Sequence, residues 1–441
     1  MRNKYLKITT IILGAIALMA IIFLLTQKPT LLQDSNSTYK ANVSYPTTPF
    51  TLTLWLPSEE KDSLDTVITE YKKIHPGATV KTEYIDSAQY QTRLLQASTT
   101  GTLPDLFVFR NDGLPLYKKY LQPAPTSVFT TDQFTQIFAG FTTKQLVSGN
   151  TIYGAPLGLA TLGLIYNQDR FTQASITTPP VSWLEFDKTN DALRKKDGQN
   201  LYLSGVALGT SLVRNYPDII SALMMQNGAL MTDQPPTKAT FELPDSSGYS
   251  PGSKAVEYYA SFAQPAKQNY SWSDSLGESV AAFAQNKTAL IVDYPMSSRL
   301  ARLQNPNLRV GMAALPQTNA STPINYGIFL TGGVSQTSKQ SEIAWDFWGF
   351  ATSKEEQKKF SLVSFWPASR NDLIKDQLND KELAPFAKQS ATATDWYRGI
   401  NYATNADLRE MLNSYLAGFD SKIVVKNASS KVTGEIQKSN Q

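Results

Sequence analysis

The chain has 441 residues, enough for two to three domain-sized units or for one large two-lobed body. Hydrophobic residues make up 41% of it and charged residues only 18%, so a disordered or highly charged chain is excluded. The net charge is +4, and without Arg2, Lys4 and Lys7 the remaining 38 basic residues nearly balance 37 acidic ones, so an electrostatic nucleic-acid binder is not expected. Cysteine is absent, which excludes disulfides, thiolate metal sites and a cysteine nucleophile.

The N-terminal segment has the pattern of a membrane anchor. Residues 8–25 read ITTIILGAIALMAIIFLL and carry no charge, and as a helix they would span about 27 Å, close to the hydrocarbon thickness of a bilayer. The basic residues in front predict a cytoplasmic segment over 1–7, with the rest of the chain outside. A cleaved signal peptide is the alternative, although the A-x-A sequence at 15–17 lies inside the apolar run. Residues 26–49 are polar and are predicted to form a flexible tether.

After the tether, strand and helix patterns alternate. The predicted elements are a strand over 50–56, a helix beginning near Ser58, a strand over 78–85, a helix over 88–97 and a strand over 106–109. This β-α-β-α-β order implies parallel strands with helices on both faces of the sheet. Further strands are predicted over 289–292 and 309–314, and a polar tail over 426–441.

Several helix details are also predicted. Ser58 is expected to cap the first helix, whose buried face extends from Leu64 to Ile74 at helical spacing. The single histidine, His75, closes this helix and is expected to be structural. Residues 353–356, Ser-Lys-Glu-Glu, fit a capping box for a later helix.

Six segments carry a family resemblance, in order along the chain. They are YQTRLLQASTTGTLPDLFVF (90–109), YGAPLGLATLGLIYNQDRF (153–171), Trp183–Glu185 after a proline pair, FAQNKTALIVDYP (283–295), RVGMAALPQ (309–317) and GIFLTGGVSQTSKQSEIAWDFWGFATSKEEQKKF (327–360). From about residue 50 to 420 the chain resembles the extracellular solute-binding subunits of ABC importers, and among them the sugar-binding group that includes the maltose-binding proteins. The lipid-bearing cysteine of many relatives is missing, and Asn286 stands where many have glycine.

The resemblance implies an α/β, two-lobed, periplasmic-binding-protein-like fold of type 2, with the lobes joined by crossover strands at a hinge. The N-terminal transmembrane helix is expected in front of this fold, from the apolar run over 8–25. Lobe 1 is expected over 50–162 and 314–364, and lobe 2 over 163–313 and 365–425. The resemblance further implies a monomer that binds a small-molecule ligand, a carbohydrate, between the lobes and docks on the permease subunits of an ABC importer. It implies no cofactor, no metal and no catalytic residue.

Candidate binding residues come from strand ends and from the resembling segments. In doubly wound sheets, ligands bind beyond the carboxyl ends of strands, where aromatic rings can stack on a sugar and polar groups can fix its hydroxyls. The candidates are Trp55, Glu59, Phe109, Arg110, Asp112, Trp272, Asp293, Tyr294, Gly332, Gly333, Trp366 and Arg370.

The residues alone leave other functions open. The sequence contains no G-x-S-x-G, H-E-x-x-H, phosphate-loop or dinucleotide fingerprint, yet a glycosidase needs only two carboxylates, and Glu59 and Asp112 are candidates to face one cleft. The resemblance favours a receptor over an enzyme. The alternatives are a receptor for another small polar solute such as a polyamine or glycerol phosphate, a ligand-sensing ectodomain without transport, and an extracellular glycosidase.

Overall fold

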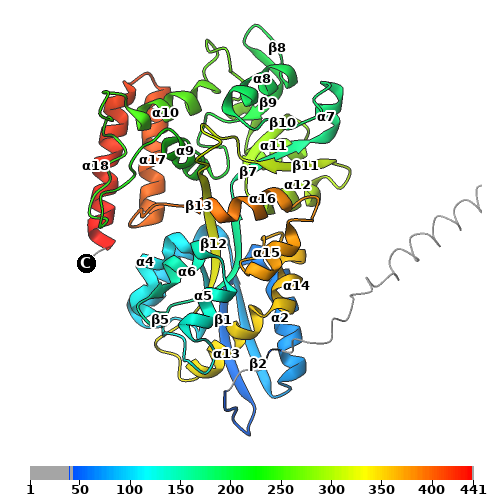
Figure 1. The fold of residues 1–441 in the computed structure, drawn as a ribbon, viewed down its shortest axis with the longest axis vertical. Coiled ribbons are helices and arrows are strands. Elements are labelled where there is room, and N and C mark those ends of the chain that lie inside the picture. The colour runs from blue at the N-terminus through cyan, green and yellow to red at the C-terminus, as the bar shows by residue number, and fades with distance from the viewer. Residues whose placement is uncertain (1–38, 40–42, 440–441) are drawn as a thin grey trace, which may run out of the picture. The chain divides into compact units, whose positions relative to one another are not determined.

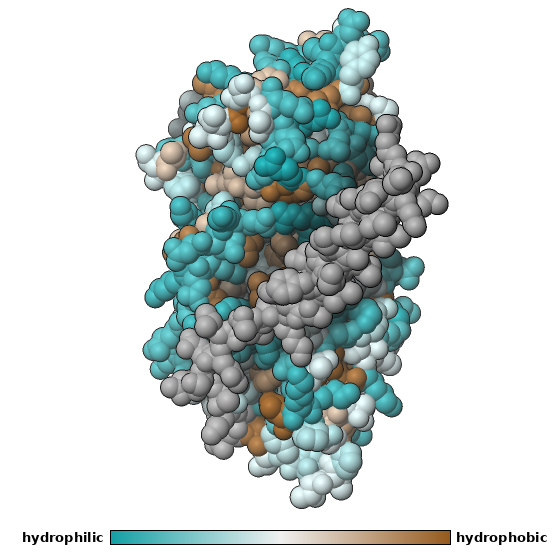
Figure 2. All heavy atoms as spheres, turned by 90° about the vertical axis from the view of Figure 1, so that its right-hand side faces the viewer, coloured by the Kyte–Doolittle hydropathy of each residue, from teal (hydrophilic) through white to brown (hydrophobic). Residues whose placement is uncertain are grey.

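The computed structural model describes residue 39 and residues 43–439 (Figure 1). The predicted anchor over 8–25 and most of the predicted tether lie outside the described residues. Within the described part of the chain, no helix combines the length and the apolar character needed to cross a membrane. On the face in Figure 2, hydrophilic residues predominate outside the grey atoms, and hydrophobic residues form small separate patches.

The first sheet has six strands. In chain order they are β1 (Phe50–Pro57), β2 (Ala78–Ile85), β3 (Leu106–Arg110), β6 (Ala155–Thr161), β12 (Asn325–Val334) and β13 (Ala393–Thr394). The spatial order is β13-β12-β3-β1-β2, and β6 also pairs with β12. β1 pairs in parallel with both β2 and β3, which confirms the parallel arrangement predicted from the β-α-β-α-β order. We call this sheet and the helices packed on it lobe 1.

Helices cover the first sheet and shield the buried apolar positions of its longer strands. Along β1, Leu52, Leu54 and Leu56 are fully buried, as the alternating pattern requires. The helices of this region are α2 (Lys61–Ile74), α3 (Ser87–Thr100), α4 (Leu114–Tyr117), α5 (Thr131–Ile137), α6 (Gly140–Leu146), α13 (Ser341–Ala351) and α14 (Lys354–Ser364). A two-stranded hairpin, β4 (Val147–Ser148) with β5 (Thr151–Ile152), lies between α6 and β6 in the chain.

The second sheet has five strands in the order β11-β7-β10-β9-β8. Their bounds are β7 (Gly163–Asn167), β8 (Lys195–Asp197), β9 (Asn200–Ala207), β10 (Thr288–Asp293) and β11 (Val310–Ala314). The helices of this part of the chain are α7 (Gln168–Gln173), α8 (Trp183–Leu193), α9 (Tyr216–Gln226), α10 (Pro251–Ser261), α11 (Ser279–Ala284) and α12 (Met296–Gln304). We call this sheet and its helices lobe 2.

The chain crosses between the two sheets at two close places. β6 ends at Thr161 in the first sheet, and β7 begins at Gly163 in the second. The return runs from β11, in the second sheet, to β12, in the first. Because β6 pairs with β12, the two connections lie beside each other, as expected for crossovers that join two lobes.

The C-terminal region differs from the expected division. Its helices are α15 (Asn371–Gln377), α16 (Ala384–Gln389), α17 (Asn401–Leu416) and α18 (Ser421–Ser439). α15 packs against α5 and α14, and β13 pairs with β12, so part of the segment assigned to lobe 2 lies on lobe 1. α17 and α18 pack on each other and on α10 of lobe 2. Residues 426–439 are not a polar tail: they belong to α18, which buries Ala428, Val432 and Ile436 at intervals of four.

Three local expectations also differ from the structure. Ser58 caps no helix, because residues 58–60 form a short 3₁₀ turn and α2 begins at Lys61. Ile74 is 52% exposed because it stands at the end of α2, beyond the part that packs on the sheet. The predicted capping box at 353–356 does not form. Ser353 precedes α14 but makes no capping hydrogen bond, and Glu356 pairs with Lys359 at 2.8 Å rather than with the backbone N–H of Ser353.

Candidate functional site

A cavity of about 390 Å³ lies between the lobes, within the size range of small-molecule sites. Its walls mix carboxylates, guanidinium groups, amides and rings from both lobes. The lining residues are Pro57, Glu59, Glu60, Ser87, Tyr90, Gln91, Leu94, Phe109, Arg110, Asp112, Gly113, Tyr117, Arg214, Asn215, Asp293, Tyr294, Met296, Ser297, Arg299, Leu300, Ile328, Leu330, Ser364, Trp366 and Asn405.

Two strand ends of lobe 1 supply charged residues of the wall. β1 and β3 are parallel neighbours, so their carboxyl ends meet at one edge of the sheet. Glu59 and Glu60 follow β1, while Arg110 ends β3 and Asp112 lies in the 3₁₀ turn after it. Arg110 and Asp112 form an ion pair at 2.9 Å.

Lobe 2 faces them with residues after β10 and before α9. Asp293 ends β10, and its backbone continues into Tyr294 and then α12. Asn215 precedes α9 and donates its side-chain amide to Asp293 Oδ1 at 2.7 Å. Its φ of 54° is in the left-handed region, which asparagine tolerates better than most residues.

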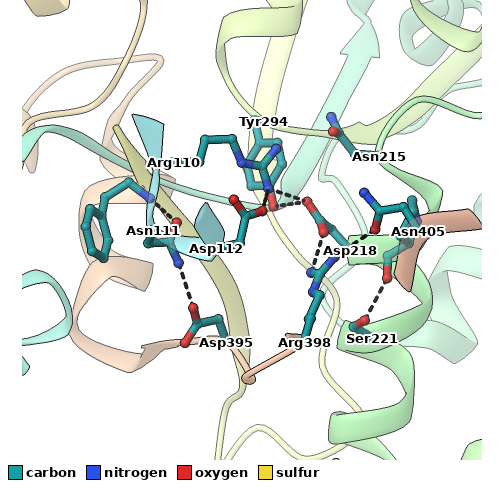
Figure 3. Close-up of polar contacts among 12 residues, drawn as sticks. Arg110, Asn111, Asp112, Asn215, Asp218, Ser221, Tyr294, Asp395, Arg398 and Asn405 are labelled. Atoms are coloured by element: carbon teal, nitrogen blue, oxygen red, sulfur yellow. Dashed lines mark hydrogen bonds and ion pairs between the residues drawn. The ribbon is translucent and has the colours of Figure 1, made fainter. Parts of the chain in front are cut away.

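A buried network links the two walls (Figure 3). Its centre is Asp218, which is 3% exposed and lies in the first turn of α9. Asp218 Oδ2 accepts from Tyr294 Oη at 2.8 Å and from Arg110 Nη2 at 3.2 Å, and Oδ1 accepts from Arg398 Nη2 at 2.6 Å. Burial raises the pKa of Asp218, but the positive charges of Arg398 and Arg110 lower it by more. The resulting pKa is below the usual value, so the group is a carboxylate.

Asp293 is the second buried carboxyl group at the cavity. Burial raises its pKa to about 6, against the opposing influence of Arg214. Its Oδ1 accepts from Asn215 and from the backbone N–H of Tyr294, but its Oδ2 has no hydrogen-bond partner in the described structure. Arg110 Nε is likewise buried without a partner there. An unmet acceptor on lobe 2 and an unmet donor on lobe 1 therefore belong to residues that line the same cavity.

Glu60 and Trp366 form another part of the wall. The indole N–H of Trp366 donates to Glu60 Oε1 at 2.9 Å, and Ser63 Oγ donates to Oε2 at 3.3 Å. Burial raises the pKa of Glu60 to about 7. Asp395, which is not among the lining residues, also has its pKa raised by burial to about 7, and it accepts hydrogen bonds from Asn111 at 2.6 Å and Gln145 at 3.1 Å.

The structure brings seven of the twelve candidate residues to the cavity. They are Glu59, Phe109, Arg110, Asp112, Asp293, Tyr294 and Trp366. Glu59, Asp112 and Tyr294 follow β1, β3 and β10, and Arg110 and Asp293 are the last residues of β3 and β10, as the strand-end argument anticipates. The aromatic residues among the seven are largely buried, with Phe109 only 4% and Tyr294 only 2% exposed.

The other five candidates lie elsewhere. Trp55 lies against the guanidinium of Arg93, at 4.5 Å from ring centroid to Cζ, and Trp272 is fully buried in the core. Arg370 pairs with Asp372 at 2.9 Å. Gly332 and Gly333 lie inside β12 and pack under neighbouring rings: a Cβ at Gly332 would approach Trp348 to 2.4 Å, and one at Gly333 would approach Phe109 to 2.9 Å.

The sequence analysis missed the centre of the network. Asp218 is the one charged residue in the otherwise apolar stretch YPDIISALMM, a signal for a buried functional carboxylate. Arg398 gives no comparable signal, because its role arises from a contact with Asp218, 180 residues away in the chain. Asn405 accepts a hydrogen bond from Arg398 and so joins the network only through it. In the described part of the chain, no group of three histidine or acidic residues is placed to hold a metal ion.

Two α/β lobes, linked by paired crossovers around a polar and aromatic cavity, define a two-lobed ligand-binding protein. The family model of bacterial extracellular solute-binding proteins matches residues 66–385. The chain belongs to this family, which confirms the resemblance and, with it, the expectation of a binding protein rather than an enzyme. Members of this family are extracellular solute-binding proteins, so the binding part lies outside the cytoplasm.

Individual proteins are similar over most of the chain. A putative binding protein of Brucella abortus (strain 2308) is 25% identical over 382 residues, covering 82% of this chain and 87% of that protein. The solute-binding protein of an ABC transporter from Thermotoga lettingae, solved with α-D-tagatose, matches with a TM-score of 0.71 and 21% identity, covering 88% of this chain and 99% of the other. The sugar-binding protein MalE of Xanthomonas citri matches with a TM-score of 0.72 and 18% identity, covering 88% and 98%. These likenesses confirm the two-lobed α/β fold.

Proposed function

We propose that the protein is a membrane-anchored extracellular receptor of an ABC importer, which captures a sugar or oligosaccharide between its lobes and delivers it to a membrane permease. Family membership supports solute capture outside the cytoplasm. Similar structures were solved with tagatose and with maltotetraose. The apolar run over 8–25 supports the anchor.

The observation that carries the choice of ligand is the pair of unmet hydrogen-bonding atoms at the cavity. Both atoms are buried, Asp293 Oδ2 as an acceptor and Arg110 Nε as a donor, so a ligand reaches them only when these side chains turn towards the cavity. A hydroxyl group is both a donor and an acceptor, so a compound with several hydroxyls then satisfies both atoms. A polyamine supplies only donors, and a phosphate supplies mainly acceptors. Both charge signs are present in the lining, which suits an uncharged polar ligand.

A ligand that contacts both lobes also provides a reason for closure. Such a ligand binds the closed arrangement better than the open one and shifts the population towards it. Arg110 lies on lobe 1 and Asp293 on lobe 2, so a sugar that contacts both residues bridges the lobes. The closed form then presents a differently shaped surface from the open form, and a permease can distinguish the two forms.

The test is calorimetric titration of the full-length protein with D-tagatose, mannobiose, maltotriose, spermidine and glycerol 3-phosphate. We expect saturable binding of at least one of the three sugars and none of the two charged compounds. Binding of spermidine or glycerol 3-phosphate alone would show that the ligand class is wrong. The absence of binding to all five would count against the receptor assignment for this cavity.

Import and anchoring need separate measurements. Cells that lack the protein should lose uptake of the sugar identified by titration, while a sensing ectodomain would leave uptake intact. The protein should sediment with membranes and keep residues 1–25 by mass spectrometry. Recovery of a soluble chain without these residues would instead support a cleaved signal peptide.

A further inference from the structure

The proposal concerns Asp218, a residue that does not line the cavity but contacts two residues that do. It is 3% exposed and stands in the first turn of α9, where the helix dipole favours a negative charge. Tyr294 and Arg110 both donate to its Oδ2, at 2.8 and 3.2 Å (Figure 3). One carboxylate oxygen therefore holds one cavity residue from each lobe.

Arg110 is shared between two carboxylates. Its Nη2 lies 2.9 Å from Asp112 of its own lobe and 3.2 Å from Asp218 of the other. If the lobes separate, Arg110 keeps Asp112 as its partner. Asp218 keeps Tyr294 of lobe 2 at 2.8 Å, and its other partner at 2.6 Å is Arg398, in the segment between β13 and α17. The contact between the lobes can thus break without leaving a buried charge unpaired. Most buried ion pairs are costly to separate because a charge is left unpaired in the interior.

A second ion pair between the lobes offers a comparison. Arg299 of α12 lies 3.2 Å from Asp62 of α2, but the Asp62 side chain is 67% exposed. Exposed pairs contribute little because water and salt screen them and two long side chains must be ordered. The Asp218 carboxylate is 5% exposed, so its attraction for Arg110 is screened much less.

We propose that Asp218 is the positioning residue of the site: it holds Arg110 and Tyr294 in their binding positions and favours the closed arrangement through a contact that forms only when the lobes meet. It acts through these two residues and does not touch the solute. The part that concerns affinity rests on the proposed function, whereas the part that concerns closure does not.

The closure part is tested without any solute. The natural chain has no cysteine, so Lys358→Cys on α14 and Gln304→Cys on α12 can carry two spin labels, one on each lobe, at exposed positions. Distance distributions are measured on the full-length protein with and without Asp218→Asn, and Asp62→Asn serves as the matched control. We expect Asp218→Asn to shift the distribution to longer distances and Asp62→Asn to leave it unchanged.

The affinity part uses whichever of D-tagatose, mannobiose and maltotriose binds. Asp218→Asn should weaken its binding at least tenfold, and Asp62→Asn by less than twofold. If Asp218→Asn does not fold, Arg110→Gln tests the same contact in the distance measurement, because Asp218 then still has Arg398 and Tyr294. When both single variants fold, the loss of affinity in the double variant should be smaller than the sum of the two single losses, since both changes remove one shared contact.

An unshifted distance distribution in both folded variants would overturn the proposal, as would strictly additive losses of affinity. A shifted distribution in a protein that binds none of the sugars would support the closure part and reject only the carbohydrate assignment. The two failures are therefore distinguishable.

Discussion

Trp366 donates its indole N–H to Glu60 across 2.9 Å, and both residues line the cavity between the lobes. Burial is the largest influence on the pKa of Glu60 and raises it to about 7, although the bonds from Trp366 and Ser63 act in the opposite direction. A carboxyl group in the cavity wall therefore changes charge near neutral pH. This gives the protein a measurable dependence on pH.

The first prediction concerns stability. The folded pKa of Glu60 is raised above its unfolded value, so the folded state holds a proton that the unfolded state has released at pH values between the two. The stabilisation is complete below the unfolded pKa and is lost as pH rises through about 7. Glu60→Gln removes this loss. The free energy of unfolding of Glu60→Gln minus that of the natural protein should therefore increase between pH 5 and pH 8, by on the order of 1–3 kcal/mol.

Urea unfolding of both proteins at pH 5, 6, 7 and 8 measures the difference. The natural curve alone does not isolate Glu60, because burial also raises the pKa values of Asp293 and Asp395, and they act in the same direction. A second variant acts on the same pKa: the charge of Glu59 also raises the pKa of Glu60, so Glu59→Gln should make the loss of stability between pH 5 and pH 8 smaller than in the natural protein. A parallel curve for Glu60→Gln would contradict the prediction.

The sequence predicted the parts of the site that follow from local pattern. Alternation and helix spacing located β1, β2, β3 and β10, and the strand-end rule placed Arg110 and Asp293 where they now line the cavity. The network around Asp218 could not be found in this way, because its partners are 108 and 180 residues away in the chain. Such contacts depend on how distant segments pack together, which no local pattern specifies.

The tryptophans and glycines that lie away from the cavity share one reason. Both residue types suit a sugar site, but they equally suit a core. Trp272 is fully buried, and Gly332 makes room for Trp348, whose indole donates to the carbonyl of Gly333 at 3.0 Å. The sequence shows that such residues are special without showing whether a ligand or a neighbouring ring occupies the space.

The second prediction tests the unmet acceptor at the cavity. Asp293→Asn keeps an oxygen for Asn215 and for the backbone of Tyr294, but it replaces the other carboxylate oxygen with an amide that cannot accept a hydrogen bond. Binding of the sugar identified by titration should weaken by about tenfold, the loss expected for one hydrogen bond to a charged group. Calorimetric titration measures it. The control is Asp169→Asn, which removes an exposed ion pair with Arg309 at 2.9 Å; equal affinities in both variants would rule out Asp293 as a ligand contact.

The third prediction separates packing glycines from binding glycines. Gly332→Ala places a Cβ 2.4 Å from the Trp348 ring, so the strand or the ring must move, and stability should fall by about 1–3 kcal/mol. Gly434→Ala, inside α18, meets nothing within 4 Å and should stabilise the protein by about 0.5–1 kcal/mol. Thermal unfolding compares the two. A stable Gly332→Ala protein that has lost only sugar binding would instead support a direct role of this glycine at the ligand.

The fourth prediction concerns His75, the single histidine of the chain. Its ring stacks on Tyr45 at 4.2 Å, and its Nε2 lies 3.8 Å from the buried Asp346, which also accepts from Tyr71 at 3.0 Å. Burial lowers the pKa of His75, against the opposing influence of Asp346, so the folded pKa lies below the unfolded value and stability should fall as pH drops through this range. Because no other histidine contributes, one imidazole resonance of the untagged protein should titrate below pH 6.5 in NMR. Tyr45→Ala uncovers the ring and should move this pKa up towards 6.5; an unchanged value would mean that Tyr45 is not what buries His75.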